Sequence, residues 1–125
     1  PMTVGDELPE LPGIDKVDGL RRMMNKPALF EKILRDFYAR LHDSPQVIRA
    51  TLANGDYSTA ERNAHSVKGL AGTIGAMGLQ DAAKALEHEL HDGHMPSEAT
   101  FAQFEKELRI VINGFAAGFS IASAG

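Results

Sequence analysis

From residue 14 onward, apolar residues recur every three or four positions, which is the spacing of one face of an α-helix. Polar and charged residues fill the positions between them, and no stretch alternates for long enough to predict a strand. The pattern therefore predicts an all-α protein. Its amphipathic segments cover residues 17–24, 27–41, 47–53, 58–74, 79–90 and 101–119.

Residues that begin and end helices separate these segments. A side-chain oxygen just ahead of a helix can accept a hydrogen bond from the first turn. Residues of this kind are Asn25 ahead of Pro27, Ser44 ahead of Pro45, Ser58 with Glu61 in a capping box, and Ser97 after Pro96. Glycines, which adopt the left-handed backbone that ends many helices, follow at positions 55, 75, 78 and 93.

The connections between the longer segments are only a few residues long, and short connections favour antiparallel neighbours. We therefore predict an antiparallel four-helix bundle with a short additional N-terminal helix. Residues 1–13 are rich in proline and glycine and predict an extended lead-in or linker. The bundle domain is accordingly expected to span residues 14–125.

The segment at residues 58–74 has an unusual exposed face. At about 100° per residue, its apolar side chains gather on one side. These are Ala60, Ala64, Val67, Leu70, Ala71 and Ile74. The opposite side carries His65, Lys68, Gly69, Gly72 and Ala76, with Glu61 and Arg62 one turn earlier. His65 is therefore predicted to face solvent, beside a surface with little side-chain bulk.

Gly69 and Gly72 stand where an exposed helix normally carries longer side chains. A glycine inside a helix costs about 1 kcal/mol relative to alanine. One explanation is that another protein's backbone approaches His65 closely, so that both glycines and Ala76 belong to a docking surface. The other explanation is that the glycines arose by neutral sequence drift, or that they lie beneath a packed side chain of a neighbouring helix.

His65 and Lys68 are three residues apart and share one helix face. Unperturbed imidazole has a pKa of about 6.5, so a ring nitrogen is nucleophilic near neutral pH. An ammonium group beside it would neutralise an anion attached to the ring. This arrangement favours a phosphorylated histidine, and the alternative is an ordinary solvated pair on a helix surface.

Composition excludes several classes of function. The chain has 125 residues, 43% hydrophobic and 24% charged, which is enough for one packed domain. A formal net charge of −4 gives no support for nucleic-acid binding. The absence of cysteine excludes disulfides, thiol nucleophiles and thiolate metal sites.

No apolar run is long enough to span a membrane, and the first residues lack the pattern of a signal peptide. We therefore expect a cytoplasmic domain without membrane contact. The start at Pro1 and Met2 favours a domain excised from a longer protein.

The segment from Ala64 to Ala76 resembles the signature of histidine-containing phosphotransfer (HPt) domains. It contains His-x-x-Lys-Gly, then a small residue and an apolar–glycine pair. Other positions resemble HPt domains that end hybrid sensor histidine kinases, and the resemblance covers roughly residues 11–93. These positions are Leu11–Asp15, Gly19–Arg21, Leu29, Phe30, Phe37, Asp56, Leu79, Ala83, Leu86 and Glu87.

The resemblance implies a four-helix bundle that carries a phosphoryl group as phosphohistidine. The group would come from the aspartate of a receiver domain and pass to another receiver. On this basis His65 is the phosphoacceptor, Lys68 is the neighbouring cation and Gly69 leaves room for the partner. The partner would dock on the surrounding surface, which includes Glu61 and Arg62.

The expected protein is a carrier and not an enzyme with turnover of its own. The sequence has no glycine-rich phosphate-binding loop, so we expect no ATP site. We also expect no metal or cofactor on this chain, because the magnesium ion would belong to the receiver. A monomer is expected for a carrier that visits two partners. The domain would be cytosolic even at the C-terminus of a membrane-bound kinase.

Glu87 is a candidate partner for the His65 ring. The helix that holds His65 turns back at residues 75–78, and the two residues are similarly distant from that turn. They should therefore lie at the same height on adjacent antiparallel helices. Glu87 would then accept a hydrogen bond from one ring nitrogen and leave the other free to attack. The alternative is a solvated glutamate that flanks the apolar stripe.

The histidine-rich segment at residues 88–94 suggests two other sites, and neither fits. His88, His91 and His94 are three residues apart, whereas a zinc-protease helix needs two histidines four apart. His88-Glu89-Leu90 matches the start of the phosphoacceptor motif of histidine-kinase dimerisation domains, but the residues that should follow are absent.

The alternative to a phosphoryl carrier is a helical adaptor that docks receiver or kinase domains without being phosphorylated.

Overall fold

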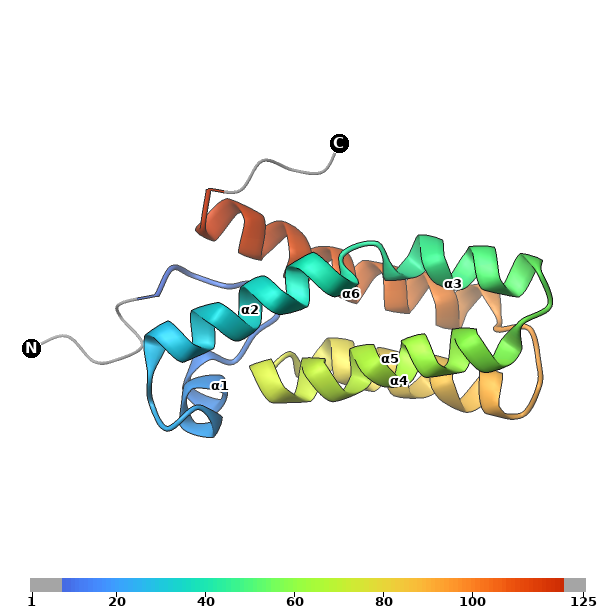
Figure 1. Ribbon diagram of the computed structural model, residues 1–125, viewed down its shortest axis with the longest axis horizontal. Coiled ribbons are helices and arrows are strands. Elements are labelled where there is room, and N and C mark those ends of the chain that lie inside the picture. Colours follow the sequence, from blue (N-terminus) through green and yellow to red (C-terminus); the bar gives the residue numbers. More distant parts are fainter. Residues whose placement is uncertain (1–7, 121–125) are drawn as a thin grey trace, which may run out of the picture.

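The computed structural model describes residues 8–120, and every regular element within this range is a helix (Figure 1). The prediction of an all-α protein is thus confirmed. The helices are α1 (Lys16–Arg22), α2 (Pro27–Leu41), α3 (Ser44–Ala53), α4 (Tyr57–Ile74), α5 (Met77–His91) and α6 (Glu98–Gly118). Residues 1–7 of the predicted lead-in and 121–125 of the predicted bundle lie outside the described residues.

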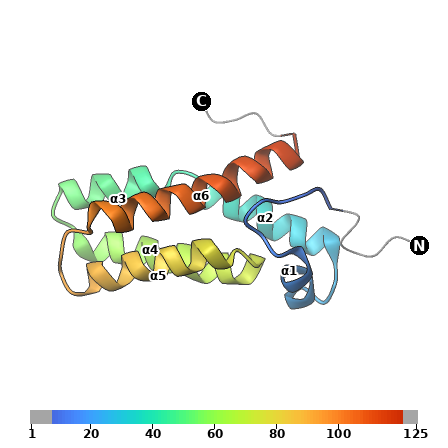
Figure 2. The same cartoon turned by 180° about the vertical axis from the view of Figure 1, so that it is seen from behind.

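The long helices pack as an up-and-down bundle (Figures 1 and 2). Helices α2 and α3 follow one another along one side and form a single arm that is interrupted at His42 and Asp43. Helix α4 returns antiparallel to α3, α5 lies beside α4, and α6 runs back along the first arm. The short α1 lies at the end of the bundle where α4 stops.

The apolar stripes meet in one continuous core. Phe30 and Phe37 of α2 and Phe104 of α6 are at most 2% exposed and belong to the same cluster of buried residues. On α4 the predicted inner face is confirmed, because five of its six apolar residues have no exposed surface and Leu70 is half-buried. The opposite face of α4 therefore points outward.

Of the predicted caps, only that of Ser97 is confirmed, since its Oγ accepts a 3.1 Å hydrogen bond from the backbone of Thr100. The capping box at Ser58 is wrong. Asp56 caps α4 instead and accepts a 3.0 Å hydrogen bond from the backbone of Thr59. The cap of α4 thus lies two residues earlier than predicted, and the helix begins at Tyr57.

Two further caps were also predicted wrongly. Asn25 adopts a left-handed φ of 56° and belongs to the turn before α2, whose first helical residue is Pro27. Ser44 lies inside the first turn of α3 and is 1% exposed, with Asp43 at the cap position. Gly78 also lies inside a helix, α5, so that Gly75 alone ends α4.

Residues 8–13 of the expected linker pack against α6. Leu8 and Leu11 are buried, and Pro12 fits against Gly114, where a Cβ would lie 2.6 Å from the proline ring. Pro9 makes a similar contact with Gly118. This part of the lead-in therefore belongs to the packed structure.

The turn between α4 and α5 sets the register of the functional site. Gly75 has a φ of 82°, and its carbonyl oxygen accepts a 2.9 Å hydrogen bond from the backbone of Asp15. Only Gly75 and Ala76 separate the two helices. Because the turn is so short, α5 must run back alongside α4. No helix within residues 8–120 is long and apolar enough to cross a membrane.

Candidate functional site

His65 lies on the outward face of α4, and its side chain is 66% exposed. Its place follows from the helix periodicity, because Ala64 and Val67 on either side point into the core. The prediction that His65 faces solvent is confirmed.

Glu87 of α5 lies at the height of His65, as the position of the turn predicted. Its Oε2 atom is 2.5 Å from Nδ1 of His65, and its Oε1 atom is 2.6 Å from Nζ of Lys68. The carboxylate is thus shared by an imidazole and an ammonium from neighbouring turns of α4. Its side chain is 17% exposed, so surrounding atoms hold it in place.

These contacts determine which nitrogen of His65 carries the proton. Burial opposes the ionisation of Glu87, but the hydrogen bonds from Lys68 and His65 outweigh it and hold the pKa of Glu87 below its ordinary value. An ionised carboxylate only accepts hydrogen bonds, so the Nδ1 atom of His65 must donate. In the neutral ring, the Nε2 atom then keeps its lone pair.

The contact that the Lys68 ammonium makes differs from the one that the helix face predicted. We expected its ammonium beside the ring, where it would face an anion bound there. The side chain instead extends to Glu87 and is 28% exposed. Its charge is therefore compensated by a carboxylate before any phosphoryl group is present.

The small residues that were predicted to lie beside His65 differ in their exposure to solvent. Gly69 is exposed, and a Cβ there would meet no atom within 4 Å, so the surface beside His65 is open. The prediction that Gly72 and Ala76 are exposed docking residues is wrong. The Gln80 side chain covers Gly72 and would overlap a Cβ placed there, and Ala76 is 0% exposed at the α4–α5 turn.

Glu61 and Arg62 lie one turn before His65. Arg62 is exposed and donates to Oγ1 of Thr59 at 3.3 Å. Glu61 binds across to α5, where its Oε2 atom is 2.9 Å from Nδ1 of His91. The hydrogen bond to Glu61 raises the pKa of His91. The sequence analysis missed this pair, although the register that joins His65 to Glu87 also joins Glu61 to His91 one turn away.

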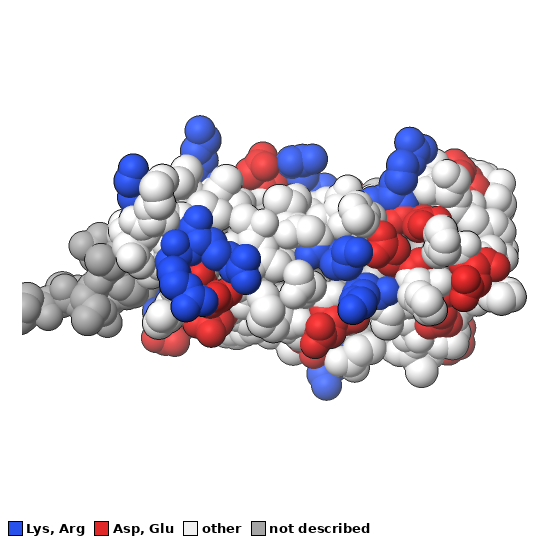
Figure 3. Space-filling model, turned by 90° about the horizontal axis from the view of Figure 1, so that it is seen from below, with Lys and Arg blue, Asp and Glu red and all other residues white. Residues whose placement is uncertain are grey.

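A groove of about 720 Å³ runs along α5 beside these pairs. It is lined by Glu61, Lys68, Asp81, Lys84, Ala85, Glu87, His88, Glu89 and His91. Figure 3 shows the molecule from the side of α4 and α5. Acidic and basic side chains intermingle there, and an uncharged stretch separates them from a second mixed cluster. Within residues 8–120, no cluster of three or more His, Asp or Glu side chains is arranged to hold a metal ion.

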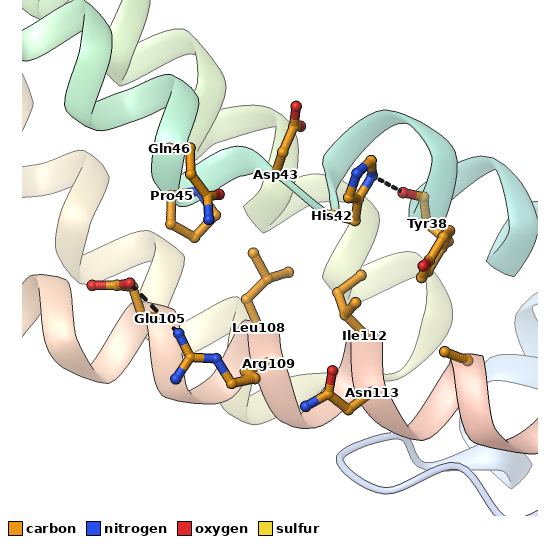
Figure 4. A pocket seen from close by; sticks show the side chains of 11 residues that line it. Tyr38, His42, Asp43, Pro45, Gln46, Glu105, Leu108, Arg109, Ile112 and Asn113 are labelled. Atoms are coloured by element: carbon orange, nitrogen blue, oxygen red, sulfur yellow. Dashed lines mark hydrogen bonds and ion pairs between the residues drawn. The ribbon is translucent and has the colours of Figure 1, made fainter. Parts of the chain in front are cut away.

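A second cavity, of about 440 Å³, lies on α2, α3 and α6 (Figure 4). His42 at its edge stacks on Tyr38 and makes a 2.9 Å hydrogen bond to that residue's backbone oxygen. None of the lining residues belongs to α4 or α5. This cavity is therefore separate from the site around His65.

Comparison with protein families identifies a match that covers most of the chain. The profile of a family described as "Hpt domain" matches residues 32–117, a range that includes His65, Lys68 and Glu87. Comparisons with curated proteins and with solved structures gave no match.

Proposed function

Because the chain belongs to the Hpt domain family, whose members carry phosphoryl groups on histidine in two-component phosphorelays, we propose that His65 is its phosphoacceptor. The observation that supports this most directly is the contact of Nδ1 with Glu87, which leaves Nε2 as the free ring nitrogen of a side chain that is 66% exposed. The donor and the acceptor of the phosphoryl group would both be receiver domains.

In the proposed step, the Nε2 lone pair of His65 attacks the phosphorus of a receiver's phosphoaspartate. The new N–P bond forms as the bond from phosphorus to the aspartate oxygen breaks, and the aspartate leaves as a carboxylate. The proton on Nδ1 stays in place. The ring therefore becomes positively charged, and the carboxylate of Glu87 stabilises that charge. Attack by the aspartate of a second receiver reverses these bond changes.

The chain's own contribution is a positioned nucleophile and the charges around it. Phosphoryl transfer depends mainly on positioning and electrostatic stabilisation, which the receiver's active site completes. The magnesium ion belongs to the receiver in this proposal. The chain acts as a cytoplasmic, monomeric carrier without turnover.

The receiver is proposed to dock on the uncharged surface beside His65. Gly69, Met77 and Gly78 are exposed there, and Thr73 is half-buried. These residues lie on the last turns of α4 and the first turn of α5. The absence of a side chain at Gly69 and Gly78 allows the edge of a receiver's active site to come close, and Met77 offers an apolar contact.

Incubation with a radiolabelled, phosphorylated receiver domain tests this function. We expect label on the chain that is labile in acid and stable in base, as a phosphoramidate is. Direct labelling by ATP without a kinase would contradict the role of a carrier. A chain that binds the receiver but takes up no label would instead be an adaptor.

Replacement of Gly69 by glutamine is expected to slow transfer without harming the fold. A Cβ at this position meets no other atom, and glutamine is a better helix former by up to about 1 kcal/mol. The added side chain would stand in the path of the receiver. We expect uptake about 10-fold slower or more, with a melting temperature equal to or above that of the wild type.

Gly69→Ala provides the matched control, because it brings at least as large a gain in helix propensity with only one added methyl group. Its transfer rate should stay close to that of the wild type. Equal rates for Gly69→Gln and the wild type would show that the receiver does not approach over this residue.

A further inference from the structure

Helices α4 and α5 present three successive pairs of residues at the same height. Glu61 with His91 and His65 with Glu87 are two such pairs, one helical turn apart on both helices. One more turn in the same direction leads from His65 to Lys68 on α4 and from Glu87 to Lys84 on α5. The third pair therefore consists of two lysines.

The two lysines differ in their partners. Lys68 leans back one turn and is held by Glu87 at 2.6 Å. Lys84 is exposed and forms no salt bridge with any residue between 8 and 120. Both line the same groove together with Glu87. Lys84 is thus a cation without a salt-bridge partner among residues 8–120. It lies one helical turn from Glu87, which hydrogen-bonds His65.

The charges around His65 indicate a role for the Lys84 ammonium in neutralising a phosphoryl group. Glu87 and Lys68 cancel each other, and the phosphorylated ring carries one positive charge, whereas the bound phosphoryl group brings about two negative charges. One negative charge of the phosphoryl group is therefore left without a counter-charge. A lysine side chain has a long and flexible stem, so its ammonium can move by about one helical turn toward a new anion.

We propose that Lys84 is the second cation of the phosphoryl-binding site and stabilises the group once it is attached to His65. This inference rests on the proposed function of His65. Lys84 makes no covalent bond in the transfer. It either contacts a phosphoryl oxygen or replaces Lys68 at the carboxylate of Glu87, and both arrangements put one further positive charge beside the phosphoryl group.

The other charged groups along this edge are compatible with that role. Asp81 lies one turn before Lys84, and Glu87 and His88 lie one turn after it. Asp81 and Glu87 are not within salt-bridge distance of Lys84. His88 lines the same groove and forms no salt bridge with any residue between 8 and 120.

The equilibrium of phosphoryl transfer separates this role from an effect on docking. At equilibrium, the ratio of phosphorylated chain to phosphorylated receiver depends only on the free proteins. A contact made only while the two are docked changes both transfer rates equally and leaves that ratio unchanged. The test is therefore the labelled fraction of the full chain after equilibration with a labelled receiver domain at low ionic strength.

We expect Lys84→Gln to shift this ratio toward the receiver by about three- to fivefold, as an exposed charge interaction allows. High salt should reduce the shift, because it screens exposed charges. Lys84→Arg should restore most of the wild-type ratio. Lys106→Gln, the same change of charge on the exposed face of α6, should have no effect.

Identical ratios for Lys84→Gln and Lys106→Gln would overturn the proposal. So would a shift that Lys84→Arg fails to correct, because it would indicate packing of the side chain and not its charge. Neither result would affect the assignment of His65. If the wild type and His65→Gln take up the same label, the proposed function itself has failed.

Discussion

Replacing His65 by glutamine is expected to abolish phosphoryl uptake from a phosphorylated receiver domain. The glutamine amide has no lone pair able to attack phosphorus, so labelling should fall from about one phosphoryl group per chain to background. The fold should persist, because the side chain at this position is 66% exposed. Acid-labile label on the purified chain, followed over time, measures the effect.

His91→Gln is the matched control for this experiment. His91 is also exposed, and its Nδ1 atom likewise bonds a glutamate across the α4–α5 interface, at 2.9 Å. The two histidines therefore differ mainly in their place relative to Lys68 and Gly69. We expect full uptake by His91→Gln. Unchanged uptake by His65→Gln, or loss of uptake in the control alone, would contradict the assignment of His65.

Removal of the carboxylate by Glu87→Ala is expected to slow transfer by about 10- to 100-fold, in the range of an oriented acid–base group. Without it, the Nδ1 atom of His65 and the ammonium of Lys68 both lose their partner. The proton of the neutral ring is then free to occupy either nitrogen, so Nε2 is not always available as a nucleophile. Single-turnover transfer from a receiver domain measures the rate.

Glu87→Gln distinguishes orientation from charge. The amide oxygen still accepts a hydrogen bond from Nδ1, so the tautomer is retained while the negative charge is lost. We expect a smaller loss of rate than with alanine. Nitrogen NMR of the ring should show one tautomer in the wild type and a mixture in Glu87→Ala. Glu61→Ala, which removes a carboxylate from the neighbouring pair, should leave the tautomer of His65 unchanged.

Helix periodicity and turn length predicted those parts of the site for which the chain has few possible conformations. The periodicity of α4 placed Ala64 and Val67 inside and His65 outside, because a helix can bury only one face. A two-residue turn then left α5 one way to return, and this brought Glu87 level with His65. The same rule would have found the pair of Glu61 and His91.

The two glycines show where such rules stop. Gly69 and Gly72 lie on one side of α4, and the sequence predicts the same environment for both. In the structure, Gly69 is open and Gly72 is covered by the Gln80 side chain. Which of them is covered depends on a long side chain from α5. The cap of α4 failed for a related reason, because Asp56 lies two residues before Ser58 and caps the helix first by accepting from the backbone of Thr59.

The sequence by itself determined that residues 8–120 are helical wherever they are regular, that His65 is exposed and that Glu87 lies at the same height on the next helix. All three follow from regular repeats and from a turn too short to vary. Only the tertiary structure decided that Lys68 binds Glu87, that Gln80 covers Gly72 and that residues 8–13 pack against α6. Long flexible side chains and irregular segments have many accessible conformations, and the neighbouring elements select among them.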